Sequence, residues 1–264
     1  MRATGFVTLL RREILRYVRR PRNTFLPPMI TNLLYFTVFG VVLGGRIDLE
    51  GVGLAGTGLS PSQAYILFIL PGLVVLGTIS NAFENSSFSI FHGRWNEYIH
   101  EVLTSPLSHT EMVLAYVLSS ALRGLIVAGI IWVIGALFAP ITIANPLYLA
   151  AFMIVIPVLF ASLGVIGGLW AEDFDYLTVM NQFIIRPLVF FGAVFYPLEA
   201  LEGFARDVSY LNPMVYMVNG VRYGVVPDAV DVAPDLSLAV LTGLTVTVLL
   251  IDVELVRRGY GLVD

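Results

Sequence analysis

The 264-residue sequence contains no lysine and no cysteine, and all fifteen of its cationic residues are arginine. Without lysine, the chain cannot supply a Walker A lysine, a kinase-type phosphate lysine or a Schiff base. Without cysteine, it cannot form disulfides, thiolate nucleophiles or cysteine-ligated zinc and iron–sulfur sites. We therefore do not expect the chain to bind or hydrolyse a nucleotide through a P-loop of its own.

Charge is also scarce. Only 13% of the residues are charged, whereas 57% are hydrophobic. A soluble domain carries about 25% charged residues, so this chain could not cover its own surface in water. The composition predicts an integral membrane protein, and its long apolar runs predict that the protein is all-α.

Six apolar runs come close to the roughly 20 residues that a helix needs to cross a bilayer. They predict transmembrane helices at about 25–43, 64–83, 112–138, 147–170, 177–196 and 236–256. A seventh run, 208–226, is interrupted by Asn212, Pro213, Asn219 and Arg222. We interpret it as a re-entrant or interfacial helical hairpin that precedes the last span.

The arginines predict the orientation of these spans, because cytoplasmic segments are enriched in positive charge. With the N-terminus inside, ten arginines face the cytoplasm, namely seven before the first span together with Arg94, Arg257 and Arg258. Only Arg46, Arg206 and Arg222 fall on the other side. We therefore predict a multi-pass protein of the cell (plasma or inner) membrane with both termini in the cytoplasm.

Residues 1–22 are predicted to form a cytoplasmic amphipathic helix that lies in the membrane interface, ahead of one transmembrane domain at 23–264. On a helical wheel the apolar side consists of Phe6, Val7, Leu10, Ile14, Tyr17 and Val18, opposite Arg11, Arg12, Arg16, Arg19 and Arg20. A plain topology anchor remains an equal alternative. A signal peptide is disfavoured, because the following apolar run is span-length and no A-x-A site follows it.

The polar segment 91–109, between the second and third spans, is predicted to contain a short amphipathic helix between Arg94 and Leu103. Its apolar face would consist of Trp95, Tyr98, Ile99, Val102 and Leu103. Pro106 would end the helix, and Ser108 or Thr110 would cap the third span with Glu111 near its positive end. Such a helix is a lever for a cytoplasmic partner, although a plain loop is an equal alternative. The spacing of its three histidines does not favour a metal site.

Two arginines, Arg123 and Arg186, are predicted to lie within spans, and Glu84 ends the second span in a polar patch. A central arginine costs about 2.5–3.5 kcal/mol even on the mild insertion scale, so each should be paired or face a wet cavity. We predict that Glu84 neutralises Arg123 or Arg186. Such a pair either fixes helix packing or lines a translocation route. The Gly164–Gly168 spacing also allows two helices to approach closely.

Several motifs in order along nearly the whole chain resemble the membrane subunit of ABC-2-type ABC transporters. They are LPPMIT at 26–31, YFTVFG at 35–40, FILPG at 68–72, EYIHEVLTSPLS at 97–108, GAVFYP at 192–197, LNPMVY at 211–216 and RYG at 222–224. The series from GAVFYP to RYG is the most specific. Arg186 departs from the family pattern, in which a neutral residue is expected.

The resemblance implies the permease subunit of an ATP-driven exporter of an amphipathic substrate, such as a drug, a lipid or a glycolipid or polysaccharide. Two permease copies, identical or paralogous, would enclose a path between their first, second and fifth spans. Two separate ATPase subunits would bind ATP and magnesium and dock on the cytoplasmic segment, so this chain would be no enzyme and would bind no cofactor. Membrane lipid is an expected partner, and nucleic acid is not.

The resemblance also implies residue roles. ATPase coupling falls to Arg94, Glu97, Glu101, Leu103 and Pro106. A role in the pathway or its buried charge is expected of Glu84, Arg123 and Arg186 from their charge at membrane depth, not from the resemblance. The extracellular re-entrant hairpin at 198–226 would seal the exit, with Tyr196, Pro197, Asn212, Pro213 and Arg222 as gate residues. An ion-coupled secondary transporter remains the first alternative, although it would need membrane-buried carboxylates and broken helices. An intramembrane lipid-modifying enzyme ranks lowest, because no histidine or paired carboxylate falls at bilayer depth.

Overall fold

The computed structural model describes residues 2–43, 58–198 and 201–262. Over these ranges the chain is helical and contains no β-strand, as the sequence predicts. The N-terminal elements are α1 (Arg2–Val18), α2 (Pro21–Tyr35) and the π-helix η1 (Phe36–Leu43); then come α3 (Pro61–Trp95), α4 (Ile99–Leu103), α5 (His109–Ala136) and α6 (Pro146–Trp170). The C-terminal elements are α7 (Phe174–Met180), the π-helix η4 (Asn181–Ile185), α8 (Arg186–Phe190), α9 (Phe204–Tyr210), α10 (Pro213–Val225) and α11 (Pro234–Arg257).

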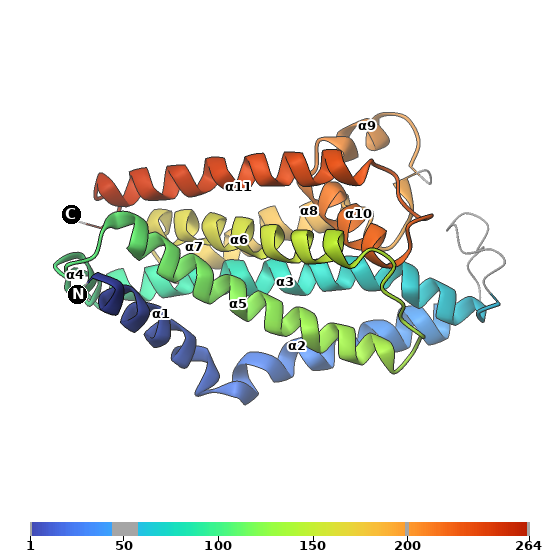
Figure 1. Ribbon diagram of the computed structural model, residues 1–264, viewed down its shortest axis with the longest axis horizontal. Helices are drawn as coiled ribbons and strands as arrows, with labels where there is room; N and C mark the ends of the chain where they lie inside the picture. Colours follow the sequence, from blue (N-terminus) through green and yellow to red (C-terminus); the bar gives the residue numbers. More distant parts are fainter. Residues whose placement is uncertain (1, 44–57, 199–200, 263–264) are drawn as a thin grey trace.

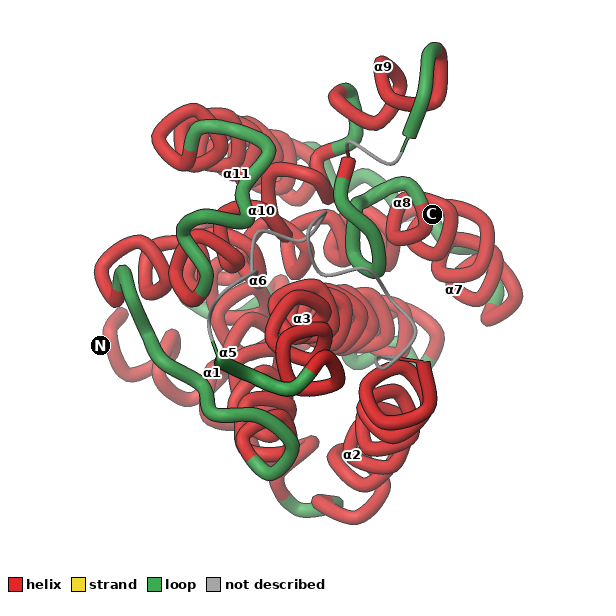
Figure 2. The backbone as a smooth tube through the Cα atoms, turned by 90° about the vertical axis from the view of Figure 1, so that its right-hand side faces the viewer, coloured by secondary structure: helices red, strands yellow, loops and turns green. Residues whose placement is uncertain are grey.

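The long helices run side by side along one axis, and α3 lies at their centre (Figures 1 and 2). Helix α3 is apolar around most of its circumference, which is the pattern of a helix enclosed by others. It packs against α5, α6 and α10. The start of α1, helix α4 and the end of α11 lie at one end of the bundle, which we call the α4 end (Figure 1). Helix α9 lies at the opposite end, the α9 end.

Four helices, α3, α5, α6 and α11, are long and apolar enough to cross a membrane. They match the predicted second, third, fourth and sixth spans. The predicted first span is divided into α2, with 15 residues, and η1, with 8, which follow each other directly. The predicted fifth span is divided into α7, η4 and α8, with 7, 5 and 5 residues. No single piece of these two reaches the roughly 20 residues of a bilayer crossing.

The end of the predicted fifth span is wrong. The prediction extends it to Tyr196, whereas α8 ends at Phe190 and the chain turns over the next six positions. Ala193 has a φ of 54°, in the left-handed region that interrupts a helix. A guanidinium from α10 binds the carbonyl of Ala193. The turn therefore depends on a tertiary contact, which the apolar pattern of the sequence does not contain.

Helices α3 and α6 approach each other as closely as the Gly164–Gly168 spacing predicts. A Cβ atom added at Gly164 would lie 2.6 Å from the carbonyl oxygen of Phe83, and one added at Gly168 would lie 2.6 Å from that of Ser87. The two contacts are four residues apart on both helices, so they form one continuous seam. This seam lets α6 pack directly on the backbone of α3.

Helix α1 packs on α5, and part of the predicted apolar face is buried there, because Phe6 and Leu10 pack against the core and Tyr17 is buried. Its most buried residues are Leu9, Glu13 and Tyr17, which are spaced by four, whereas Val7 and Val18 are exposed. Burial raises the pKa of the Tyr17 hydroxyl to about 12, so this group stays neutral. The hydroxyl donates a hydrogen bond to the carbonyl of Ser119 on α5, at 3.3 Å. The helix therefore uses a partly polar face to hold the bundle.

The segment between α3 and α5 also differs from its prediction. Helix α3 continues to Trp95, which is 59% exposed, and only Ile99–Leu103 forms a separate helix. Glu97 lies in the intervening turn with a φ of 61°, which separates the two helices. The predicted N-terminal cap of the third span is confirmed, because Ser108 caps α5 and the Glu111 side chain accepts a hydrogen bond from the Ser108 backbone.

Candidate transport cavity and its two ends

A cavity of about 540 Å³ lies between α2, α3 and the η4–α8 segment. These elements correspond to the first, second and fifth predicted spans. Helix α2 lines it with Asn23, Thr24, Pro27, Pro28, Thr31, Asn32 and Tyr35; α3 and α5 with Leu76, Gly77, Ser80, Asn81, Glu84 and Arg123; and the remaining wall with Asn181, Ile185, Val189, Phe190 and Phe195. Amide, hydroxyl and charged groups share this lining with aliphatic and aromatic side chains. We call it the transport cavity.

The charged part of the transport cavity contains Glu84 and Arg123. An Oε atom of Glu84 accepts a hydrogen bond from the Asn181 side chain at 2.9 Å, which ties α3 to η4. A guanidinium nitrogen of Arg123 donates to the Oδ1 atom of Asn85 at 3.3 Å. The two charges attract each other, although no ion pair within 4.0 Å joins them in the described part of the chain. The cavity thus brings together the charges that the sequence singles out.

Two neighbours of Glu84 bear on its predicted pairing with Arg123 or Arg186. Asn181 donates a hydrogen bond to its carboxylate, and Arg123 attracts that carboxylate from across the same cavity. Arg186 is the first residue of α8, but its side chain lies outside the described part of the structure. The second half of the prediction, a pairing of Glu84 with Arg186, stays a prediction.

Aromatic rings form another part of the transport cavity. Tyr35 lies 6.0 Å from Phe195, and Phe39 stacks on Phe195 at 5.1 Å between ring centroids. The hydroxyl of Tyr65 on α3 donates to the carbonyl of Phe195 at 3.1 Å and so holds this residue in place. The cavity therefore combines a charged part with an aromatic part.

At the α9 end, the predicted gate residue Arg222 is buried, with 1% of its surface exposed. It donates a hydrogen bond to the carbonyl of Ala193 at 2.8 Å and lies 3.7 Å from the carboxylate of Asp231. Its guanidinium also lies 4.1 Å from the ring centroid of Phe68 on α3. One side chain thus connects α10 with α3, with the turn after α8 and with the loop before α11.

The other predicted gate residues lie around the same turn. The Tyr196 hydroxyl donates to the carbonyl of Phe190 at 2.5 Å, and Pro197 follows it. Asn212 caps α10, of which Pro213 is the first residue. The Asn212 side chain donates to the carbonyl of Leu188 at 2.6 Å, so it joins α10 to α8. All five predicted gate residues therefore lie in or beside the turn that follows α8, and Phe190 and Phe195 of the same region line the transport cavity.

At the α4 end, Arg94 donates from one guanidinium nitrogen to the carbonyls of Gly168 and Ala171, each at 2.8 Å. It thereby fastens the end of α3 to the end of α6. The other predicted coupling residues lie on or beside α4. Glu97, Glu101 and Pro106 are exposed, and Leu103 is partly buried against the core. The exposed charges of this group lie on the outside of the bundle, where a partner could reach them.

Sequence reasoning missed Glu13, which is 2% exposed and lies between two arginines of α1. Its carboxylate lies 2.8 Å from Arg12 and 3.3 Å from Arg16, and it accepts a hydrogen bond from Ser89 on α3. Arg16 in turn donates to the Asn85 side chain, at 3.1 Å, which also binds Arg123. A continuous polar network therefore connects α1 with the transport cavity. The spacing of Glu13 from Leu9 and Tyr17 was the signal that could have found it.

A second missed residue is Asp252 on α11, which is fully buried. Ser162 on α6 donates a hydrogen bond to one of its carboxylate oxygens. The sequence-based prediction singled out no residue of the sixth span and so passed over this one. Asp252 joins the two helices away from the transport cavity, because neither it nor Ser162 lines that space.

Helices long and apolar enough to cross a membrane, packed beside a cavity of mixed polarity, fit a transport permease. The chain belongs to the ABC-2 type transporter family, because the model of that family matches residues 4–226. The match includes α1, the transport cavity and α10. The resemblance stated from the motifs is thus confirmed.

Individual relatives agree with the family assignment. The chain is 34% identical over 252 residues to the inner membrane transport permease YadH of Escherichia coli K12, covering 95% of this chain and 94% of the relative. It is 21% identical to nodulation protein J of Neorhizobium galegae, covering 89% and 85%. It is 23% identical to the putative transport permease ycf38 of Porphyra purpurea, covering 81% and 72%.

Proposed function

We propose that this protein is the membrane subunit of an ATP-driven exporter, in which a separate ATPase supplies the energy and this chain supplies the path. The observation that carries the proposal is the transport cavity, which lies between the elements that the motifs assign to the pathway. Its charged and aromatic parts fit an amphipathic substrate such as a drug, a lipid or a glycolipid.

The proposal includes a topology of six crossings. The pairs α2–η1 and α7–η4–α8 would provide the first and fifth crossings, and α9–α10 would form the extracellular re-entrant hairpin. The arginine distribution supports a cytoplasmic α4 end, and α1 would lie in the membrane interface there with its exposed arginines at the lipid headgroups. Large apolar residues of α2, among them Ile30 and Leu34, are exposed next to the cavity. A second permease copy would cover them and complete the path.

The ATPase would dock on α4 and the turn before it. The exposed Glu97, Glu101 and Trp95 offer charged and aromatic contacts, and Arg94 transmits their position to α6. Purification of the tagged full-length chain from its native membranes should retain an ATPase with a Walker A motif. If the purified chain moved substrate across proteoliposomes with no ATPase present, the proposal would be wrong.

Substitution Glu84→Gln is expected to impair transport. It removes the charge that attracts Arg123, and an arginine at membrane depth without compensation costs about 2.5–3.5 kcal/mol. We expect about half of that cost, roughly 1.4 kcal/mol, to enter the barrier of the transport step, which would lower ATP-dependent export about tenfold. Export of a fluorescent amphipathic dye from vesicles containing the complex would measure this. Glu202→Gln, at an exposed site on the α9 end, is the matched control and should export normally. Normal export by Glu84→Gln would contradict the assigned role of Glu84.

Substitution Glu101→Ala is expected to uncouple ATP hydrolysis by the ATPase from export through this chain. Because Glu101 is exposed on α4, the fold should keep its thermal stability while export per ATP hydrolysed falls about tenfold or more. ATP hydrolysis and dye export, measured in the same proteoliposomes, give this ratio. Glu202→Ala makes the same change at the opposite end and should leave the ratio unchanged. An unaltered ratio in Glu101→Ala would place the coupling contact elsewhere.

An ion-coupled secondary transporter is the second candidate, and one observation favours it. Asp252 is a fully buried carboxylate in a membrane-crossing helix, which is the kind of group that carries protons in such transporters. Export that requires a proton gradient, needs no ATP and is abolished by Asp252→Asn would support this alternative.

A further inference from the structure

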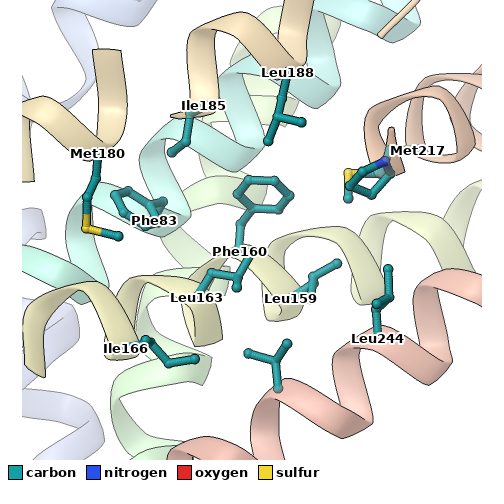
Figure 3. Close-up of a pocket in the computed structure, with 12 residues that line it drawn as sticks. Phe83, Leu159, Phe160, Leu163, Ile166, Met180, Ile185, Leu188, Met217 and Leu244 are labelled. Carbon is teal, nitrogen blue, oxygen red and sulfur yellow. The ribbon is translucent and has the colours of Figure 1, made fainter. Parts of the chain in front are cut away.

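A second cavity, of about 300 Å³, lies on the other side of the η4–α8 segment from the transport cavity. Its walls come from α3, α6, α10, α11 and the segment Met180–Leu188, and every lining side chain is apolar. Figure 3 shows the ring of Phe160 in the middle of these walls, with Met180, Ile185 and Leu188 on one side and Leu244 on the other. We call it the apolar cavity.

The contents of the apolar cavity follow from its lining and surroundings. Water inside it would find no hydrogen-bond partner among the lining side chains, and an empty space of this size would forfeit the contacts of its walls. Leu244 lines the cavity and is nevertheless 40% exposed, so the cavity opens beside α11. Helix α11 crosses the membrane and exposes Val246 and Leu250 on its outer surface. The medium at the opening is therefore lipid hydrocarbon.

The wall between the two cavities is one helix thick. Ile185 lines both spaces, whereas its neighbours divide: Met180 and Leu188 face the apolar cavity, and Asn181 and Val189 face the transport cavity. Part of this wall is the π-helix η4. Asn181 is also the residue that binds Glu84. Whatever fills the apolar cavity therefore supports, from behind, the wall that holds the charged part of the transport cavity.

We propose that the apolar cavity binds one acyl chain of a membrane phospholipid, which braces the η4–α8 wall. Its lining is suited to an alkyl chain, because Leu159, Phe160 and Met217 form a buried floor and Met180 can adapt its shape to the chain. The binding site stands on its own geometry. Only its bracing effect on transport rests on the proposed function.

Photo-crosslinking in nanodiscs tests the site without any transport. The full-length chain is reconstituted with phosphatidylcholine that carries a diazirine near the middle of one acyl chain. After illumination, adducts are expected on Phe160 and Met217, which are 2% and 0% exposed and can be reached only from inside the cavity. Bulk lipid at the surface would modify Leu250 instead, and this adduct serves as the internal reference.

Two filling variants and one matched control make the test specific. Leu159→Phe fills the floor and Leu244→Trp fills the opening, and each should lower the Phe160 and Met217 adducts at least fivefold relative to Leu250. Val246→Trp changes the outer surface of the same helix and should leave them unchanged. Monodisperse elution of each variant verifies that it is folded. If wild-type adducts occurred only on exposed residues, or if neither folded filling variant lowered the buried adducts, the site would be refuted, and the proposed export function would be unaffected.

Discussion

Replacement of Gly168 by leucine is expected to prevent stable folding of the bundle. A Cβ atom at this position would lie 2.6 Å from the carbonyl oxygen of Ser87 and 2.8 Å from the Cβ atom of Ile90. Backbone atoms of α3 cannot move aside as the end of a flexible side chain can. Overpacking a core usually costs about 1–3 kcal/mol, and a leucine forced against backbone belongs at or above the upper limit. Fluorescence-detected gel filtration after heating should show an aggregated protein or a strongly lowered unfolding temperature.

The matched control is Gly243→Leu on α11, where an added Cβ atom meets no other atom within 4 Å. It makes the same change in another membrane-crossing helix, and its unfolding temperature should remain close to that of the unmodified protein. Equal stability of the two variants would show that the α3–α6 contact at Gly168 does not hold the bundle together.

Substitution Arg222→Met is expected to break the contacts that join α10 to α3 and to the turn after α8. It leaves the carboxylate of Asp231 without its arginine and the carbonyl of Ala193 without its donor. Removal of one partner from a buried ion pair costs about 3–5 kcal/mol, because the other charge loses its counterion while it stays largely shielded from water. We expect a large fall in the unfolding temperature together with early proteolysis of the turn after α8, which limited proteolysis with mass spectrometry would detect.

A double substitution separates the ion pair from the other contacts of Arg222. Arg222→Met combined with Asp231→Asn also removes the carboxylate that has lost Arg222, and should recover part of the lost stability, since coupled residues give non-additive changes. Arg206→Met, at an exposed site near the same end, is the control and should cost little. If Arg222→Met alone were as stable as this control, the contacts of Arg222 would not be what holds α10 in place.

The membrane location and helical class of the protein could be read directly from its sequence. Apolar runs of bilayer length predicted the four helices α3, α5, α6 and α11, with starts and ends close to those observed except at the end of α3. The N-terminal cap of α5 could also be predicted, because a serine three residues before a glutamate makes the capping box at Ser108. The glycine spacing at 164–168 predicted a close helix contact, but not that α3 is the partner.

The misses have a common physical reason, which is that they depend on contacts between distant segments. The end of α8 is set by Arg222 of α10, and Glu13 of α1 is buried because Ser89 and Arg16 satisfy its carboxylate. Asp252 depends in the same way on Ser162, 90 residues away. A hydropathy pattern reports how apolar a residue is and contains no information about which partner will meet it.

The shortage of charge and the long apolar runs were therefore enough to predict a helical membrane protein. The absence of lysine adds the expectation that this chain hydrolyses no nucleotide through a P-loop of its own. Charged and gate residues could be selected because they interrupt apolar segments, and a charge at membrane depth is so costly that it is usually paired or functional. Only the tertiary structure decided that Glu84 and Arg123 share one cavity, and that an apolar cavity lies behind the same wall. Cavities form between helices, so their shape depends on how the helices pack, which one chain's hydropathy does not specify.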